Sequence, residues 1–165
     1  MRLEVRTLLK PIQLYILFAF IMLSFMLVFV PKREIKKLFW FGLLWGSTLD
    51  FIVETLFSVL HLIKYLNIEP FNLGVLPLWT VLSWTPTNIV FIYFLPEQKK
   101  RYIFWLYILM YSGLTAAVGT ILVQLRLLVF IHWSVVHWFI LAVIFYYLMA
   151  KHYQLLEPKE MGSFE

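Results

Sequence analysis

The sequence predicts an all-α fold, an integral membrane bundle of about five transmembrane helices. The first observation is composition: 62% of the 165 residues are apolar and only 14% are charged, whereas a soluble domain is nearer half apolar and a quarter charged. The second is that apolar stretches of about 20 residues recur, which is the length that a spanning helix needs. The third is that basic residues gather in short runs between these stretches, as topology signals do.

The first predicted span covers residues 11–30, where only Gln13 and Ser24 interrupt the apolar run. The basic segment before it resembles the start of a signal peptide. However, the apolar run is longer than the roughly 7–15 residues of a signal-peptide core, and no small-residue cleavage site follows it. We therefore expect a retained membrane anchor.

The second and third predicted spans cover residues 37–63 and 73–95. The second is long for a single span, so we expect it to tilt or to protrude from the bilayer. Residues that favour turns separate the two spans: Asn67, Pro70, Asn72 and Gly74.

The last apolar stretch of the chain is longer than one span can be. Its most polar break lies around Gln124 and Arg126, so we place a tight turn there and expect two helices, at about 102–123 and 129–150. A four-span arrangement with a re-entrant piece is the alternative. A polar C-terminal tail, 151–165, completes the single membrane domain.

The distribution of positive charge predicts the orientation in the membrane. Cytoplasmic loops carry an excess of Lys and Arg, and here nine such residues lie on one side of the predicted spans and five on the other. We therefore expect a multi-pass protein of the cell membrane with its N-terminus outside and its C-terminus in the cytoplasm. The nine are Lys32, Arg33, Lys36, Lys37, Lys99, Lys100, Arg101, Lys151 and Lys159, and the five are Arg2, Arg6, Lys10, Lys64 and Arg126.

We expect the apolar spans to contact the lipid bilayer, which is the predicted partner of the protein. The net charge of +5 does not indicate nucleic acid, because the basic residues form short runs between spans and no continuous phosphate-binding face. Gly42 and Gly46 form a GxxxG spacing, which lets two helices approach closely. We expect packing within the bundle there, and contact with a second copy or with a partner subunit stays open.

One polar stripe stands out on the second span. Asp50 and Glu54 are the only acidic residues inside the predicted spans, and an ionisable side chain at the bilayer centre costs roughly 2.5–3.5 kcal/mol on insertion scales. Helical periodicity puts Asp50, Glu54 and His61 on one face. We expect this face to point into the bundle or toward a water-filled cavity.

Polar residues of other spans are expected at similar depth. Thr87 and Asn88 lie near the middle of the third span, and His137 of the fifth lies about as deep as Glu54. The sequence therefore predicts one polar binding site within the membrane. Its candidate residues are Asp50, Glu54, His61, Thr87, Asn88 and His137.

Three functions fit such a site. The first is a small non-enzymatic carrier or channel-like component, or a subunit of a membrane assembly. The second is an intramembrane enzyme for a lipid-soluble substrate, with Glu54 or Asp50 as acid or base and His137 as partner. The third is a purely structural bundle. We favour the first and assign no catalytic residue.

No metal or cofactor is expected. The chain has no cysteine, which excludes thiolate nucleophiles and Cys-based metal sites. His132 and His137 are five residues apart, so they do not share a helix face. No zinc-protease motif, nucleophile elbow, phosphate loop or dinucleotide fingerprint occurs.

Several short motifs resemble those of a known family. They are the basic segment Lys32-Arg33-Glu34, the run Phe41-Gly42-Leu43-Leu44-Trp45-Gly46-Ser47-Thr48-Leu49-Asp50, the triplet Pro77-Leu78-Trp79 and the later Pro96. This part of the chain, under half of it, resembles an uncharacterised family of small multi-pass membrane proteins of spore-forming Firmicutes. The resemblance implies a membrane bundle and no assigned activity.

Overall fold

The computed structural model describes residues 10–96 and 101–156, and within them the chain is mostly helical. The all-α fold class is confirmed, and strands occur only as short pieces in the connections. The helices are α1 (Pro11–Phe29), α2 (Lys32–Leu43), the π-helical turn η1 (Leu44–Thr48), α3 (Leu49–Val59), α4 (Leu78–Tyr93), α5 (Arg101–Gln124) and α6 (Val135–Leu156). The strands are β1 (Ile63–Tyr65), β2 (Asn72–Leu73), β3 (Leu76–Pro77) and β4 (Leu128–Phe130).

Three of the helices are long and apolar enough to cross a membrane. They are α5, α6 and the continuous rod Lys32–Val59, which has 28 residues and comprises α2, η1 and α3. The other two rods in the described residues are shorter, with 19 residues in α1 and 16 in α4. Length and composition therefore support three membrane-spanning helices among the predicted five.

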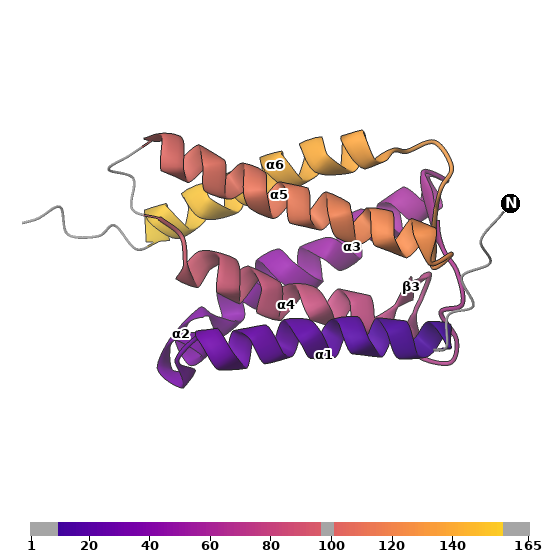
Figure 1. Cartoon of the computed structure of the whole chain (residues 1–165), viewed down its shortest axis with the longest axis horizontal. Coiled ribbons are helices and arrows are strands. Elements are labelled where there is room, and N and C mark those ends of the chain that lie inside the picture. The colour runs from indigo at the N-terminus through magenta and orange to yellow at the C-terminus, as the bar shows by residue number, and fades with distance from the viewer. Residues whose placement is uncertain (1–9, 97–100, 157–165) are drawn as a thin grey trace, which may run out of the picture.

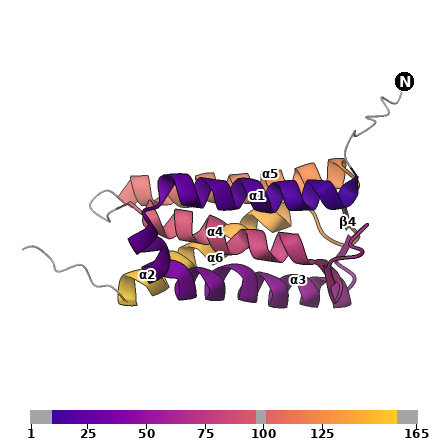
Figure 2. The ribbon, with the colours of Figure 1, turned by 90° about the horizontal axis from the view of Figure 1, so that it is seen from below.

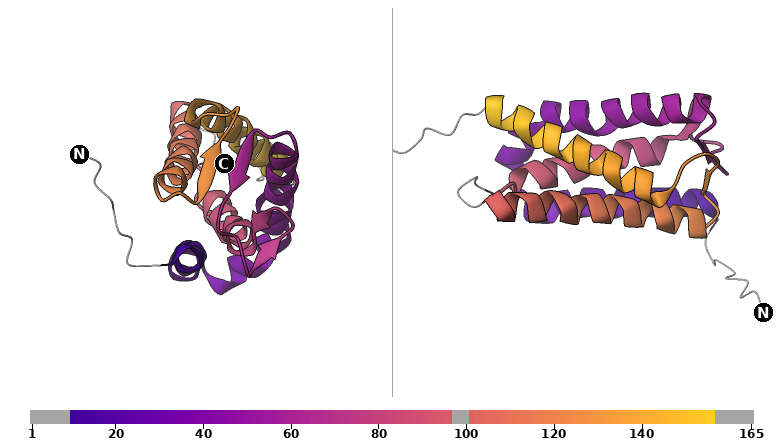
Figure 3. Two further views of the ribbon diagram at one scale, coloured as in Figure 1. Left: turned by 90° about the vertical axis from the view of Figure 1, so that its right-hand side faces the viewer. Right: turned by 90° about the horizontal axis from the view of Figure 1, so that it is seen from above.

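The rods run alternately up and down the long axis of the molecule (Figures 1 and 2). The first three rods form one group, because α1 packs against α4 and α4 packs against α2 and η1. The remaining helices, α5 and α6, pack against each other. The view along the axis places α1 outside the other rods, beside α4 (Figure 3, left). The bundle thus consists of a three-rod group and a two-helix group.

The second rod is shifted toward the N-terminus relative to its predicted span of 37–63. It begins at Lys32, because Pro31 has φ −58° and serves as the N-cap, a backbone setting that suits the start of a helix. The basic residues expected in a loop therefore lie in the first turns of α2. The rod ends at Val59, and His61 has φ +56°, a left-handed conformation that stops a helix.

The third and fifth helices begin later than predicted because short strands precede them. The segment before α4 is a hairpin of β2 and β3 with φ +63° at Gly74, so α4 starts at Leu78 and not at 73. Before α6, β4 pairs with β1, so the helix starts at Val135 and not at 129. It continues to Leu156, so residues 151–156 of the predicted polar tail are helical and the rest of that tail lies outside the described residues.

One end of the bundle is joined by the antiparallel pair β1–β4, in which Lys64 lies opposite Val129. Both strands follow the same helix-ending motif: the Leu62 N–H donates to the Phe57 carbonyl at 2.9 Å, and the Leu127 N–H donates to the Leu122 carbonyl at 2.8 Å. These six-to-one bonds define the Schellman motif. The pair links the three-rod group to the two-helix group.

The opposite end is joined by an aromatic cluster. The Phe91 ring of α4 lies 5.1 Å from that of Tyr107, 4.9 Å from that of Tyr111 and 4.6 Å from that of Tyr146, measured between ring centres. The Tyr107 hydroxyl also donates to the Phe91 carbonyl at 2.8 Å. The two groups are therefore tied together at both ends, and the space between them lies at mid-length.

Candidate functional site

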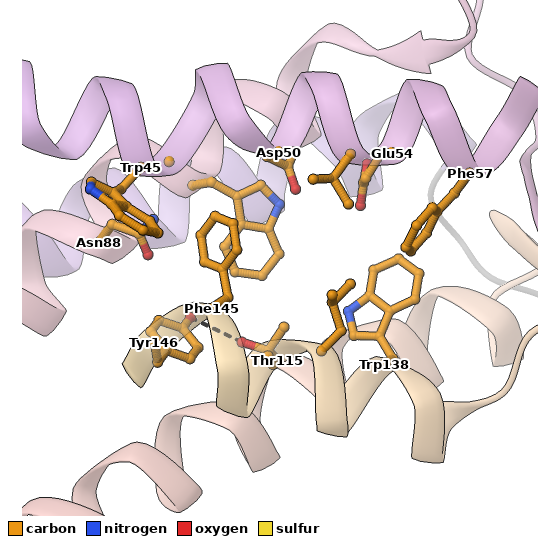
Figure 4. A pocket seen from close by; sticks show the side chains of 14 residues that line it. Trp45, Asp50, Glu54, Phe57, Asn88, Thr115, Trp138, Phe145 and Tyr146 are labelled. Atoms are coloured by element: carbon orange, nitrogen blue, oxygen red, sulfur yellow. Dashed lines mark hydrogen bonds between the residues drawn. The ribbon is translucent and has the colours of Figure 1, made fainter. Parts of the chain in front are cut away.

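A pocket lies at this mid-length position, between the rod Lys32–Val59 and α6, with α4 and α5 completing its walls (Figure 4). The centres of water-sized molecules can occupy about 70 Å³ of it. One water needs only ~10–15 Å³ on this measure, so the pocket has room for several waters or a small polar group. Its lining residues are Trp45, Gly46, Asp50, Val53, Glu54, Phe57, Trp84, Asn88, Thr115, Trp138, Leu141, Ala142, Phe145 and Tyr146.

The lining of the pocket is not equally enclosed on all sides. Phe57 on α3 and Leu141 and Phe145 on α6 are only partly buried, whereas Asn88 and Ala142 are buried. The pocket is therefore less enclosed at Phe57, Leu141 and Phe145.

The π-helical turn η1 sets the wall that carries the acids. Gly46 in this turn lies so close to α4 that an added Cβ would be 2.7 Å from backbone atoms of Trp84 and Thr85. Ser47 fixes the contact, because its hydroxyl donates to the Val81 carbonyl at 2.7 Å and lies 2.6 Å from the Thr85 hydroxyl. Single π-turns inside α-helices are frequent at functional sites, and here α3 begins directly after one.

Glu54 has a defined partner. It is 3% exposed, and the Tyr65 hydroxyl lies 2.8 Å and 2.9 Å from its two carboxyl oxygens. Tyr65 belongs to β1, so the strand pair at the end of the bundle is hydrogen-bonded to Glu54 through this side chain. Burial, together with the negative charge of Glu54, raises the pKa of the Tyr65 phenol, which keeps this hydroxyl protonated as the donor.

Asp50 lies one turn before Glu54, and both side chains point from their helix into the pocket (Figure 4). Unlike Glu54, its buried Oδ2 has no hydrogen-bond partner. Two further polar atoms of the lining are in the same state: Oδ1 of Asn88 and Nε1 of Trp84. Asn88 is 2% exposed. Buried polar atoms nearly always have partners, so these three are available for polar contact with a bound molecule or water. Four other such atoms, on Thr55, Trp79, Thr80 and Trp133, lie outside the pocket lining.

The wall opposite the acids is mainly aromatic. Trp138, Phe145 and Tyr146 of α6 face the carboxyl groups across the pocket (Figure 4). The Tyr146 hydroxyl lies 3.0 Å from that of Thr115 on α5. On the near wall, Trp45 donates from Nε1 to Nδ1 of His152 at 2.9 Å. Trp45 and Tyr146 are therefore held in place by bonds to neighbouring side chains.

No lysine, arginine or histidine lines the pocket in the described part of the chain. Within residues 10–96 and 101–156, no three His, Cys, Asp or Glu side chains come close enough together to hold a metal ion. The acids therefore face a mainly aromatic and apolar cavity.

Three of the six predicted site residues, Asp50, Glu54 and Asn88, line the pocket. Thr87 is half-buried and donates to the Ser83 carbonyl of its own helix. The two histidines lie outside. His61 is exposed beyond the end of α3, and His137 is exposed in the first turn of α6, where it lies 2.7 Å from the Ser134 hydroxyl.

The prediction of a shared site is therefore corrected at both histidines. The second rod ends before His61, so the helical periodicity used to place that residue does not apply. Because α6 starts at Val135, His137 lies near the end of the bundle and not at the depth of Glu54.

Three lining or supporting residues have no place in the predicted site: Tyr65, Trp138 and Phe145. Tyr65 lies outside every predicted helix and reaches the site only through the strand pair. The aromatic content of 19% indicates that aromatic side chains are available to line a pocket. It does not indicate which of them face Asp50 and Glu54.

Comparison with family profiles, curated proteins and solved structures finds no match for this chain.

Proposed function

We propose that this chain is a small multi-pass protein of the cell membrane, acting as a carrier or channel-like component with a binding site inside the bilayer. The observation that carries the proposal is the pocket between the two helix groups, into which Asp50 and Glu54 project, with no basic side chain among the described residues of its lining. Ionisable groups inside a membrane bundle usually mark ion or substrate pathways.

The surface of the bundle supports membrane insertion. Large apolar side chains are more than half exposed on α1, α5 and α6, among them Phe20, Leu106 and Val136. At 1.5 Å per residue, the 19 residues of α1 span about 28 Å and the 16 of α4 about 24 Å. These lengths approach the ~30 Å hydrocarbon thickness, so α1 and α4 join the three longer helices in a five-span arrangement.

Charge supports the orientation. The end of the bundle where α2 begins and α6 finishes carries Lys32, Arg33 and Lys151, whereas Lys64 and Arg126 lie at the strand end. Since cytoplasmic loops carry the excess of Lys and Arg, the strand end faces outward. The exposed Trp40 and Tyr102 suit the headgroup level of the cytoplasmic leaflet.

Binding is favoured over the other two functions by the surroundings of Asp50. In a purely structural bundle we expect a buried carboxyl to be paired, and Oδ2 of Asp50 has no partner. For the enzyme, the predicted acid–base partner was His137, which lies outside the pocket. A ligand-binding site explains the unpaired Asp50 oxygen and does not require His137 in the pocket.

Modification by a lipid-soluble carbodiimide tests the proposal. Dicyclohexylcarbodiimide partitions into bilayers and converts neutral carboxyl groups to stable N-acylureas, which peptide mass spectrometry locates. With the protein in liposomes, we expect an adduct on Asp50, less on the hydrogen-bonded Glu54, and none on the exposed loop acid Glu69.

The Asp50→Asn variant is the matched control and should lose the main adduct. A water-soluble carbodiimide should give the reverse pattern, with Glu69 modified and Asp50 spared. If the water-soluble reagent modifies Asp50 as readily as Glu69, the carboxyl lies outside the bilayer and the proposal is wrong. If neither reagent reaches Asp50, the site is sealed and the structural function is favoured.

A further inference from the structure

We infer that the ligand of this pocket is a small organic ammonium cation, held by Asp50 and Glu54 and enclosed by the aromatic walls. The inference rests on the proposed function, because it names the class of molecule for the same pocket.

The sign of the ligand's charge follows from the acids. Asp50 and Glu54 are four residues apart on one helix, which puts their Cβ atoms about 5–6 Å apart. No basic residue lines the pocket in the described part of the chain. A carboxylate in an apolar interior is unstable without a compensating charge, so these groups either bind a proton or bind a cation.

The chemistry of the cation follows from the remaining walls. Six of the fourteen lining side chains are aromatic: Trp45, Phe57, Trp84, Trp138, Phe145 and Tyr146. The faces of such rings attract ammonium groups, most strongly those of Trp, and aromatic cages that recognise quaternary ammonium ligands use this attraction. Acids on one wall and rings on the opposite wall (Figure 4) complement a compact charge with an apolar surface.

An inorganic cation fits the lining less well. Calcium takes six to eight oxygen ligands, and magnesium needs near-octahedral oxygen geometry. Among the described residues, no three acidic or histidine side chains come close enough together to hold a metal, and most of the lining is carbon. The pocket's size also sets a limit, since space for the centres of water-sized molecules is about 70 Å³. A headgroup of choline size suits that space better than a large polycyclic cation.

Buried polar atoms complete the match. Oδ1 of Asn88 is unpartnered in a side chain that is 2% exposed, and the Trp84 Nε1–H is unpartnered as well. A ligand hydroxyl, or a water that enters with the ligand, can donate to the first and accept from the second. The pocket thus offers one region for positive charge and another for a neutral polar group.

Charge balance predicts that binding releases a proton. With the pocket empty, a neutral carboxyl holds its proton. When the cation enters, the O–H bond breaks, the proton passes to solvent, and the carboxylate pairs with the ammonium. One positive charge enters and one leaves, which is the stoichiometry of a proton/cation exchanger.

Choline and its uncharged carbon isostere 3,3-dimethylbutan-1-ol provide the test. Purified protein in a maltoside detergent, at low buffer concentration with a pH-sensitive dye, is titrated with each compound while Trp fluorescence is recorded. We expect choline to give a saturable fluorescence change with release of about one proton per molecule bound, and the alcohol to give neither.

Three variants make the test specific. Asp50→Asn/Glu54→Gln should weaken choline binding by roughly tenfold or more and abolish proton release, whereas the exposed acid variant Glu69→Gln should behave as the unmodified chain. Phe145→Leu keeps both acids and should weaken choline binding several-fold while still releasing a proton. Equal binding of choline and the alcohol, or choline binding that survives in the double variant, overturns the inference.

The outcome is separable from that of the proposed function. A chain in which Asp50 reacts with the lipid-soluble carbodiimide but which does not bind choline retains an intramembrane site and loses the ammonium assignment. If Asp50 does not react with the lipid-soluble carbodiimide and choline does not bind, both the intramembrane site and the ammonium assignment are wrong.

Discussion

Asp50 and Glu54 share one face of α3 but have different surroundings. Glu54 accepts the Tyr65 hydroxyl, which links the pocket to the strand pair, whereas Oδ2 of Asp50 lacks a partner. A bond to a carboxylate stabilises more than one between neutral groups. Glu54 therefore stabilises the fold through this bond and also lines the pocket. Asp50 lines the pocket without such a bond.

The variant Tyr65→Phe tests the structural share of Glu54. It removes the donor but keeps the ring, so the buried Glu54 carboxyl group loses its hydrogen bond to β1. We expect a loss of roughly 1–3 kcal/mol in the free energy of unfolding, measured by thermal or denaturant unfolding in detergent. The exposed Tyr93 supplies the control, since Tyr93→Phe should change stability by less than about 0.5 kcal/mol.

The variant Asp50→Asn should behave in the opposite way. In the proposed site the empty pocket holds Asp50 as a neutral carboxyl group, and an amide of the same shape costs about as much to bury, so we expect nearly unchanged stability together with weaker choline binding. The same unfolding and fluorescence assays measure both. A loss of more than about 1 kcal/mol would mean that the carboxyl group has a structural partner, and it would contradict our assignment.

The predictable part of the site was its acidic wall. Two acids within an apolar span stand out in any sequence, and helical spacing puts them on one face, so Asp50 and Glu54 could be chosen without a structure. Asn88 was found because it lies at the middle of its span. Tyr65 could not be found in this way, because its place depends on the pairing of two strands far apart in the chain.

The π-turn η1 and the end of α2 pack closely against α4. A Cβ on Gly46 would lie 2.7 Å from the backbone of Trp84 and Thr85, and one on Gly42 would lie 2.5 Å from Ile89. The GxxxG spacing therefore serves packing within the bundle, as the sequence predicts. The contact of Gly46 with α4 also positions the start of α3, and therefore the direction in which the Asp50 side chain points.

The variant Gly46→Ala tests this contact. Backbone atoms cannot give way as a side chain can, so the helices must separate, and we expect a loss of about 1–3 kcal/mol in the free energy of unfolding. Gly113 on α5 is the matched control, since a Cβ there meets no atom within 4 Å. Gly113→Ala should raise stability by up to about 1 kcal/mol, through helix propensity alone.

Helix boundaries were harder to predict than the helices themselves. The apolar runs locate each rod, but the strands at one end of the bundle are also apolar, so residues 73–77 and 129–134 were counted as helix. Hydropathy does not distinguish a buried strand of three residues from a helical turn. The left-handed residues His61 and Arg126 would ordinarily be glycines, which removed the usual signal for a helix end.

The whole molecule is two helix groups joined at both ends around a pocket. The strand pair ties one end and the Phe91 cluster the other, so the pocket lies at mid-length. In the proposed five-span arrangement, this position is the driest part of the bilayer. In so dry an environment a carboxylate is strongly destabilised unless it binds a proton or a cation. The location of the site is therefore a property of the assembled bundle and not of any one helix.

Orientation can be measured cleanly because the chain has no cysteine. We expect Glu69→Cys to react with a membrane-impermeant maleimide in intact cells, and Arg33→Cys to react only after permeabilisation, because the strand end faces outward in the proposed orientation. Gel shift of the labelled protein gives the result. The reverse pattern would invert the topology, and reaction of both in intact cells would rule out a spanning arrangement.

The most direct measurement is nuclear Overhauser contact between the N-methyl protons of choline and the protein's ring protons, recorded in maltoside micelles. The chain has seven Trp residues, whose indole signals are assigned by single Trp→Phe variants. We predict contacts to Trp84, Trp138 and Phe145, which disappear in Asp50→Asn/Glu54→Gln. Contacts confined to the exposed rings of Trp40 or Trp105, or contacts unchanged in the double variant, would contradict a cation site in this pocket.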